Sequence, residues 1–175
     1  ILAEVDDEAL ATAYHEAGHC LAARLLRPEI RVASVSATPD EGGAGSLALG
    51  FDALGPVEDD PPFGFPPAAS TSLEHALVGI HLAGREAQWL GTGQRPVHGH
   101  LDDWIEARIR TIRLMHPTAA VRPTAESLQS AVGEEDWDAV RKLLEELSRR
   151  YPDVKTRLQE RREAIKSLLV QHRSQ

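Results

Sequence analysis

His15-Glu16-Ala17-Gly18-His19 is an H-E-x-x-H pattern, and the interpretation of the whole chain starts from it. Residues four apart in a helix share one face, with Cβ atoms about 5 to 6 Å apart, so two imidazoles at this spacing can bind one metal ion. Glu16 is rotated by about 100° from His15 on such a helix, which places its carboxylate beside the ion without making it a ligand. The pattern therefore predicts a zinc site with a built-in general base, as in metallopeptidases.

The motif lies in a segment that has the features of an amphipathic helix. Asp6 or Asp7 can cap the start, apolar residues recur at helical spacing, and Pro28 prevents continuation. Gly18 costs about 1 kcal/mol relative to alanine inside a helix and is usually kept for a close approach, here of the metal ion or of a crossing strand. The alternative is a pair of core histidines beside an incidental glutamate.

A catalytic zinc site needs a third protein ligand and an open position for water. Downstream residues of suitable chemical type are Glu74, His75, His81, Glu86, His98, His100, Asp102 and Asp103. Spacing alone does not choose among them. His98 and His100 are kept as optional contributors to zinc binding or to stabilisation of an oxyanion. The remaining histidines are interpreted as ordinary core or surface residues: His75, His81, His116 and His172.

Three segments of the chain follow a known family pattern in order and spacing. They are residues 12–19 (TAYHEAGH), 83–87 (AGREA) and 99–103 (GHLDD). They resemble the T-A-x-H-E-A-G-H, G-G-R-x-A and G-A-S-N-D segments of FtsH-type peptidases, the proteolytic domains of membrane-anchored AAA zinc proteases. The resemblance covers roughly residues 8–116 and implies a mainly helical zinc peptidase domain.

The resemblance also implies the third ligand. In that family the aspartate that ends G-A-S-N-D binds zinc, and the equivalent residue here is Asp103. The metal set is then His15, His19 and Asp103 around Zn²⁺, with Glu16 as the catalytic base. Small residues such as Ala107 share a helical face with Asp103, which permits a close helix approach. Without the resemblance, Asp102 is an equal candidate.

Two short segments between the predicted helices alternate like strands. Residues 31–37 and 47–51 read as a two-stranded hairpin with a glycine-rich turn at 40–45. The predicted fold class is therefore mainly α with a small β-hairpin, α+β. An extended substrate can pair with an edge strand beside the zinc, and the candidate substrate-binding residues are Leu47, Ala48, Leu49 and Gly50.

The domain prediction is a zinc metallopeptidase-like core at 1–130 followed by a C-terminal helical pair at 131–175. The core contains a proline-rich loop at 52–69, interpreted as a mobile flap near the cleft. Tyr151-Pro152 separates the two C-terminal helices, which pack on the core or present a partner surface.

Composition narrows the class of protein further. A net charge of −8 argues against nucleic acid as a partner, and the single Cys20 excludes an internal disulfide framework and is compatible with a cytoplasmic location. No apolar run is long enough to cross a bilayer.

No G-x-x-x-x-G-K-[ST] loop occurs, so the ATPase of the family is not expected in this segment, whose first residue is not methionine. Members of the family form hexameric rings, so a homo-oligomer is possible.

The predicted function is a zinc-dependent endopeptidase that acts on flexible or unfolded polypeptide, with a zinc-bound water activated by Glu16. Two alternatives stay open. One is a catalytically inactive scaffold of the same fold that binds a peptide or partner, and the other is a different zinc hydrolase with another third ligand.

Overall fold

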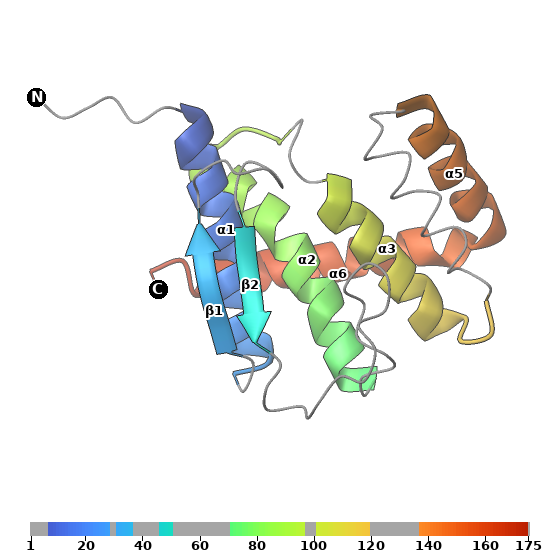
Figure 1. Ribbon diagram of the computed structural model, residues 1–175, viewed down its shortest axis with the longest axis horizontal. Coiled ribbons are helices and arrows are strands. Elements are labelled where there is room, and N and C mark those ends of the chain that lie inside the picture. The colour runs from blue at the N-terminus through green and yellow to red at the C-terminus, as the bar shows by residue number, and fades with distance from the viewer. Residues whose placement is uncertain are drawn as a thin grey trace, which may run out of the picture.

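The computed structural model describes residues 7–28, 31–36, 46–50, 71–96, 101–119 and 137–174. Its elements, shown in Figure 1, are α1 (Asp7–Leu26), β1 (Arg31–Ser36), β2 (Ser46–Gly50), α2 (Thr71–Thr92), α3 (Leu101–Met115), α5 (Trp137–Arg150) and α6 (Pro152–Gln171). Helix α1 packs along α2, and α3 lies on the other side of α2. Helix α6 runs behind these helices and contacts α1, α2, α3 and α5.

These helices form a helical bundle, and the α+β fold class expected from the sequence is wrong. The hydrophobic core that the structure describes is built from side chains of the helices. The only strand pairing in the described ranges is the antiparallel ladder of β1 with β2, in which Val35 is paired with Leu47. Two short strands that pair only with each other within the described ranges are too few to form an independent layer of the fold. The predicted turn at 40–45 and the proline-rich loop at 52–69 lie outside the described residues.

Helices α1 and α2 approach unusually closely at the level of the H-E-x-x-H motif. A Cβ added to Gly18 would lie 2.4 Å from Cβ of Ala87 and 2.6 Å from the carbonyl oxygen of Ala83. A Cβ added to Gly84 of α2 would lie 2.4 Å from Nε2 of His19. Gly18 therefore makes room for the backbone of α2, and not for an ion or a crossing strand as expected.

Helix α6 connects the two hydrophobic clusters that hold the bundle together. One cluster joins α1, α2 and α6 through Ala22, Ala23, Leu73, Leu77, Ile80, Ala83, Ile165 and Leu169. The other joins α2, α3, α5 and α6 through Val78, Leu82, Ile105, Ala107, Ile109, Ile112, Val140, Leu147, Val154 and Leu158. The C-terminal helices thus pack on the core, and the predicted boundary near residue 130 falls outside the described ranges. None of the described helices combines the length and apolarity needed to cross a bilayer.

A buried ion pair ties α3 to α2. Nη1 of Arg110 lies 3.0 Å from both carboxylate oxygens of Glu74, and the two side chains are only 4% and 10% exposed. Arg110→Met should lower the free energy of unfolding by about 3 kcal/mol, because Glu74 would stay buried without its main countercharge. Urea unfolding followed by circular dichroism measures this loss.

The control for this prediction is an exposed pair on α5. Arg141 lies 3.1 Å from Asp138, with side chains 65% and 78% exposed. Arg141→Met should lower the free energy of unfolding by less than about 1 kcal/mol. Equal losses of unfolding free energy in the two variants would show that burial does not increase the contribution of the Arg110–Glu74 pair to stability.

Candidate metal centre

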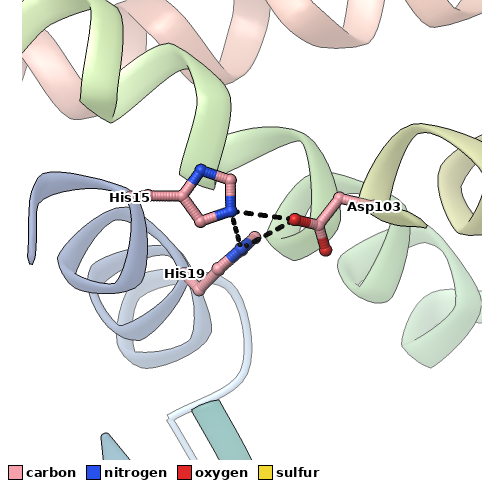
Figure 2. Close-up of side chains that lie close together, drawn as sticks. All are labelled: His15, His19 and Asp103. Carbon is pink, nitrogen blue, oxygen red and sulfur yellow. Dashed lines mark hydrogen bonds and ion pairs between the residues drawn. The ribbon is translucent and has the colours of Figure 1, made fainter. Parts of the chain in front are cut away.

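Two imidazoles from α1 and one carboxylate from the first turn of α3 converge on a single point (Figure 2). Nε2 of His15 lies 2.9 Å from Oδ2 of Asp103, Nε2 of His19 lies 3.1 Å from the same oxygen, and the two Nε2 atoms are 3.0 Å apart. Both histidines are 6% exposed. The structure thus brings together the three residues that the sequence and the resemblance had singled out as ligands.

The size and chemistry of this triangle fit a small divalent metal ion. Zinc ligands lie about 2.0 to 2.1 Å from the ion, so the edges of a tetrahedral site measure about 3.3 Å. The observed edges of 2.9 to 3.1 Å are shorter by a few tenths of an ångström, which small side-chain movements supply. Two imidazole nitrogens and a carboxylate oxygen suit zinc and other first-row divalent metals.

The tautomer of His19 restricts what can lie between its Nε2 atom and the carboxylate of Asp103. Nδ1 of His19 lies 2.6 Å from the carbonyl oxygen of Ile80, and since a carbonyl only accepts, Nδ1 carries the hydrogen. Nε2 of a neutral His19 therefore presents a lone pair to Oδ2 of Asp103 at 3.1 Å. Two lone pairs do not face each other at this distance without a cation between them. That cation is either a proton on His19 or a metal ion.

The charges and hydrogen bonds of the cluster shift the pKa values of His19 and Asp103 in opposite directions. Burial by itself would raise the pKa of Asp103, but the charge of His19 and hydrogen bonds from His15, His19 and His81 hold that pKa well below its usual range. Burial would likewise lower the pKa of His19, yet the Asp103 charge and hydrogen bond outweigh it and the pKa is raised. Asp103 is therefore ionised at neutral pH, as a metal ligand must be.

Glu16 lies next to the cluster without joining it. Its side chain is buried, with the residue 6% exposed, and its charge interacts with His19, His15 and Asp103. Burial raises the pKa of Glu16, the two histidines oppose that change, and Asp103 adds to it. A buried carboxylate of raised pKa beside a candidate metal site is suited to accept and return a proton.

His81 on α2 is a residue of the site that the sequence interpretation missed. Its Nδ1 lies 3.0 Å from Oδ1 of Asp103. The other carboxylate oxygen, Oδ2, contacts His15 and His19. The sequence analysis included His81 among the residues of suitable type for a third ligand, but interpreted it as an ordinary core or surface histidine. Its pairing with Asp103 depends on how α2 crosses α3, which local sequence does not reveal.

Removing the His81 ring should weaken metal binding without abolishing it. His81→Ala is expected to lower zinc affinity by about 10- to 100-fold, because the ligand carboxylate would lose the hydrogen bond that orients it. Competition with a chromogenic chelator measures the affinity. His75→Ala is the matched control, since His75 lies on the same helix and contacts Arg161 instead. Unchanged affinity in His81→Ala would exclude this orienting role.

The remaining ligand candidates are engaged elsewhere or lie outside the described residues. Glu74 pairs with Arg110, and Glu86 pairs with Arg162 through a 2.9 Å contact between Oε1 and Nε. His98, His100 and the side chain of Asp102 lie outside the described parts. The predicted substrate-binding residues lie in β2: Leu47, Ala48, Leu49 and Gly50.

The backbone of β2 has the arrangement that peptide pairing requires. One edge of this strand pairs with β1, and within the described ranges no strand pairs with the other edge. Both strands contact α1, the helix that carries the two histidines. Substrate binding along β2 stays a prediction.

Comparison of the chain with protein-family models, with curated proteins and with solved structures found no match. The resemblance to FtsH-type peptidases therefore stays a prediction from residues 12–19, 83–87 and 99–103. The functional interpretation of the chain rests on the geometry of the site itself.

Proposed function

We propose that this protein is a zinc-dependent endopeptidase in which His15, His19 and Asp103 bind the metal ion and Glu16 is the general base. The observation that carries the proposal is a cluster of three possible ligand atoms within 4.8 Å of one another, from two buried residues and one half-buried residue. The buried carboxylate of Glu16 lies beside this cluster. The opposed lone pairs of His19 and Asp103 support a cation between them. The H-E-x-x-H spacing supports a hydrolytic role for Glu16.

The proposed peptide hydrolysis assigns a separate role to the metal ion, to Glu16 and to His81. A bound zinc ion supplies Lewis acidity, which lowers the pKa of water and polarises a carbonyl oxygen. Glu16 takes the proton of the attacking water and returns it to the leaving amine. His81 holds the carboxylate of Asp103 in place during this process.

The proposed substrate is flexible or unfolded polypeptide. An extended chain can pair with a strand edge through its backbone, whereas a folded protein does not offer its backbone in this way. Strand β2 is the proposed docking edge because it contacts α1 and has one edge without a strand partner within the described residues. A cytoplasmic location and self-association remain predictions from the sequence.

A second candidate function is compatible with the same geometry. A protonated His19 paired with Asp103 satisfies the 3.1 Å contact without any metal ion. The domain would then be a catalytically inactive scaffold that binds a peptide or partner. Metal binding decides between the two.

The proposal is tested by zinc titration of chelator-treated protein, combined with cleavage of unfolded casein. One equivalent of zinc should bind tightly and restore cleavage in the wild type. His15→Ala and Asp103→Ala should lose both properties, whereas Asp102→Ala should keep them. Absence of stoichiometric zinc binding would favour the catalytically inactive scaffold. Zinc binding without peptide cleavage would indicate a different hydrolase.

Stability without metal and stabilisation by zinc should depend on pH in opposite directions. The pKa of His19 is raised in the folded protein above its ordinary value of 6.5. Its contribution to stability is therefore complete below about pH 6.5 and is lost as pH rises through the raised pKa. Zinc binds only the deprotonated ring, so stabilisation by zinc grows over the same range.

Scanning calorimetry measures both pH dependences. With a chelator present, the midpoint of unfolding should fall between about pH 6 and pH 8, and the rise in midpoint caused by one equivalent of zinc should be larger at pH 8. A zinc-induced rise that is independent of pH would exclude competition between the proton and the metal at His19.

A further inference from the structure

Asp103, the proposed third ligand, lies in the first turn of α3, where the backbone of a helix is held by the fewest hydrogen bonds. Helix α3 begins at Leu101, and the first four N–H groups of a helix have no partner within it. Terminal turns of this kind open easily unless tertiary contacts hold them. The position of Asp103 relative to the imidazoles of α1 therefore depends on what this turn contacts.

Trp104, the next residue along the chain, makes such contacts. Its half-buried indole packs against the hydrophobic cluster shared by α2, α3, α5 and α6. The guanidinium carbon of Arg162 on α6 lies 5.8 Å from the centre of the ring, and that of Arg108 lies 5.7 Å from it. Both are cation–π distances, and this interaction is strongest for tryptophan. Trp104 thus connects the turn that carries Asp103 to α6.

Arg162 is itself fixed to α2. Its Nε donates to Oε1 of Glu86 at 2.9 Å, and one of its terminal nitrogens donates to the side-chain oxygen of Gln159 at 3.3 Å. The side chains of Arg162 and Glu86 are only 17% and 4% exposed, so salt and water screen their ion pair little. A ring held by this guanidinium therefore has a fixed place relative to α2, the helix that also carries His81.

The second guanidinium supports the ring in a different way. Nη1 of Arg108 donates to Oγ of Ser148 at 2.7 Å and to the carbonyl oxygen of Leu144 at 3.3 Å, both on α5. Arg108 follows Trp104 by four residues on the same helix, so the two side chains are neighbours within α3. Their contact does not fix the ring relative to α2. The contact that matters for the metal centre is the one with Arg162.

These contacts lie beside the candidate metal centre. Trp104, Arg162 and Glu86, which we call the Trp104 clamp, line one small depression together with His81 and Asp103. The imidazoles of α1 contact the carboxylate of Asp103 itself, whereas the clamp holds the turn through the residue next to it. The two sets of contacts together determine where the carboxylate lies.

We propose that the Trp104 clamp positions the third metal ligand. Arg162 and Glu86 hold the indole in place, and the indole keeps the carboxylate of Asp103 turned toward the imidazoles of α1. The members of the clamp are positioning residues, because they act through Asp103. The proposal rests on the metal centre of the proposed function and adds to it a role for the C-terminal helix α6.

The test compares two tryptophans that make the same kind of contact with α6. Trp104→Leu removes the ring of the clamp. Trp89→Leu is the matched control, because Nζ of Lys166 on α6 lies 5.7 Å from the centre of the Trp89 ring on α2. Competition with a chromogenic chelator should show zinc affinity lowered by about tenfold or more in Trp104→Leu and unchanged in Trp89→Leu. Trp104→Phe should restore most of the affinity, because phenylalanine also presents a ring face to a cation.

A spectroscopic measurement separates positioning from a general loss of stability. A catalytic zinc site has four ligands and can take up a fifth. Co²⁺ in the same site absorbs visible light more weakly as ligands are added. A carboxylate that no longer holds its place lets water enter, so the absorption should weaken in Trp104→Leu and not in Trp89→Leu. Urea unfolding with a chelator present measures the stability of each metal-free variant.

A double variant tests whether Arg162 acts through the ring. Arg162→Lys keeps a positive charge for Glu86 but replaces the planar guanidinium, and it should weaken zinc binding as well. The affinity of the double variant with Trp104→Leu should equal that of Trp104→Leu alone within about twofold. Additive losses would overturn the clamp. If Trp104→Leu does not fold, Arg162→Lys decides by itself, since a lowered zinc affinity supports the clamp and an unchanged one overturns it.

The outcomes separate the clamp from the proposed function. Wild-type zinc affinity in Trp104→Leu, or an equal loss in Trp89→Leu, overturns the clamp and leaves the peptidase standing. Zinc binding that depends on Trp104 in a protein that cleaves no peptide establishes the clamp and overturns the peptidase. A wild type that binds no zinc overturns the metal centre, and the role of the clamp with it.

Discussion

Glu16→Gln should reduce the rate of peptide cleavage by about a thousandfold or more while leaving zinc affinity nearly unchanged. The amide keeps the size of the side chain but does not accept a proton from water. Glu16 lies beside the cluster without joining it, because the three converging ligand atoms belong to His15, His19 and Asp103. Initial rates on unfolded casein at saturating zinc, with a parallel zinc titration, measure both quantities.

Glu8→Gln is the matched control for this experiment. Glu8 lies on the same helix, about two turns earlier, and is exposed. The control should retain full activity. Near-normal cleavage by Glu16→Gln would assign the base to another residue, and loss of zinc together with activity would make Glu16 a contributor to metal binding.

Gly84→Ala should weaken zinc binding by about a hundredfold or more. The added Cβ would lie 2.4 Å from Nε2 of His19 and 2.7 Å from Nε2 of His15, which are the proposed ligand atoms. The His19 ring cannot easily move away because its Nδ1 donates to the carbonyl of Ile80. Helix propensity works in the opposite direction, since alanine is favoured over glycine by about 1 kcal/mol in a helix interior. Competition titration with a chelator measures the zinc affinity.

Gly79→Ala separates the effect on the site from the general effect of the substitution. Gly79 is on the same helix, and its added Cβ would meet the flexible ends of Leu26 and Ile165 at 2.8 and 2.9 Å. Those side chains can adjust, so this variant should lose some stability but bind zinc as the wild type does. Wild-type zinc affinity in Gly84→Ala would mean that the imidazoles and α2 are not as close as described.

The local part of the site could be predicted from the sequence, because it depends on helix geometry alone. A spacing of four residues places His15 and His19 on one face of α1 whatever surrounds them. The helix extends over Asp7–Leu26, consistent with the predicted capping region and with the stop before Pro28. Ala107, expected to permit a close approach near Asp103, is fully buried.

The long-range part of the site could not be derived from spacing. Asp103 is 84 residues from His19, and only the resemblance singled it out from Asp102 and the other candidates. His81 was missed for the same reason, because its contact with Asp103 joins two different helices. Such contacts depend on helix crossings, and a single sequence contains no direct signal for them.

The fold class was wrong for a different physical reason. Alternating residues in 31–37 and 47–51 indicated strands, but alternation does not say how large a part of the fold the strands make. Here the core lies between helices. Gly18 was correctly interpreted as a point of close approach, yet its partner is α2, and a glycine signals that space is needed without indicating what fills it.

The most direct test of the proposed metal centre is a crystal structure of the zinc-loaded protein with anomalous diffraction recorded at the zinc absorption edge. We expect one strong peak between Nε2 of His15, Nε2 of His19 and Oδ2 of Asp103, at about 2.0 to 2.2 Å from each atom. No peak at this position, or a zinc ion bound without Asp103, would contradict the proposed centre.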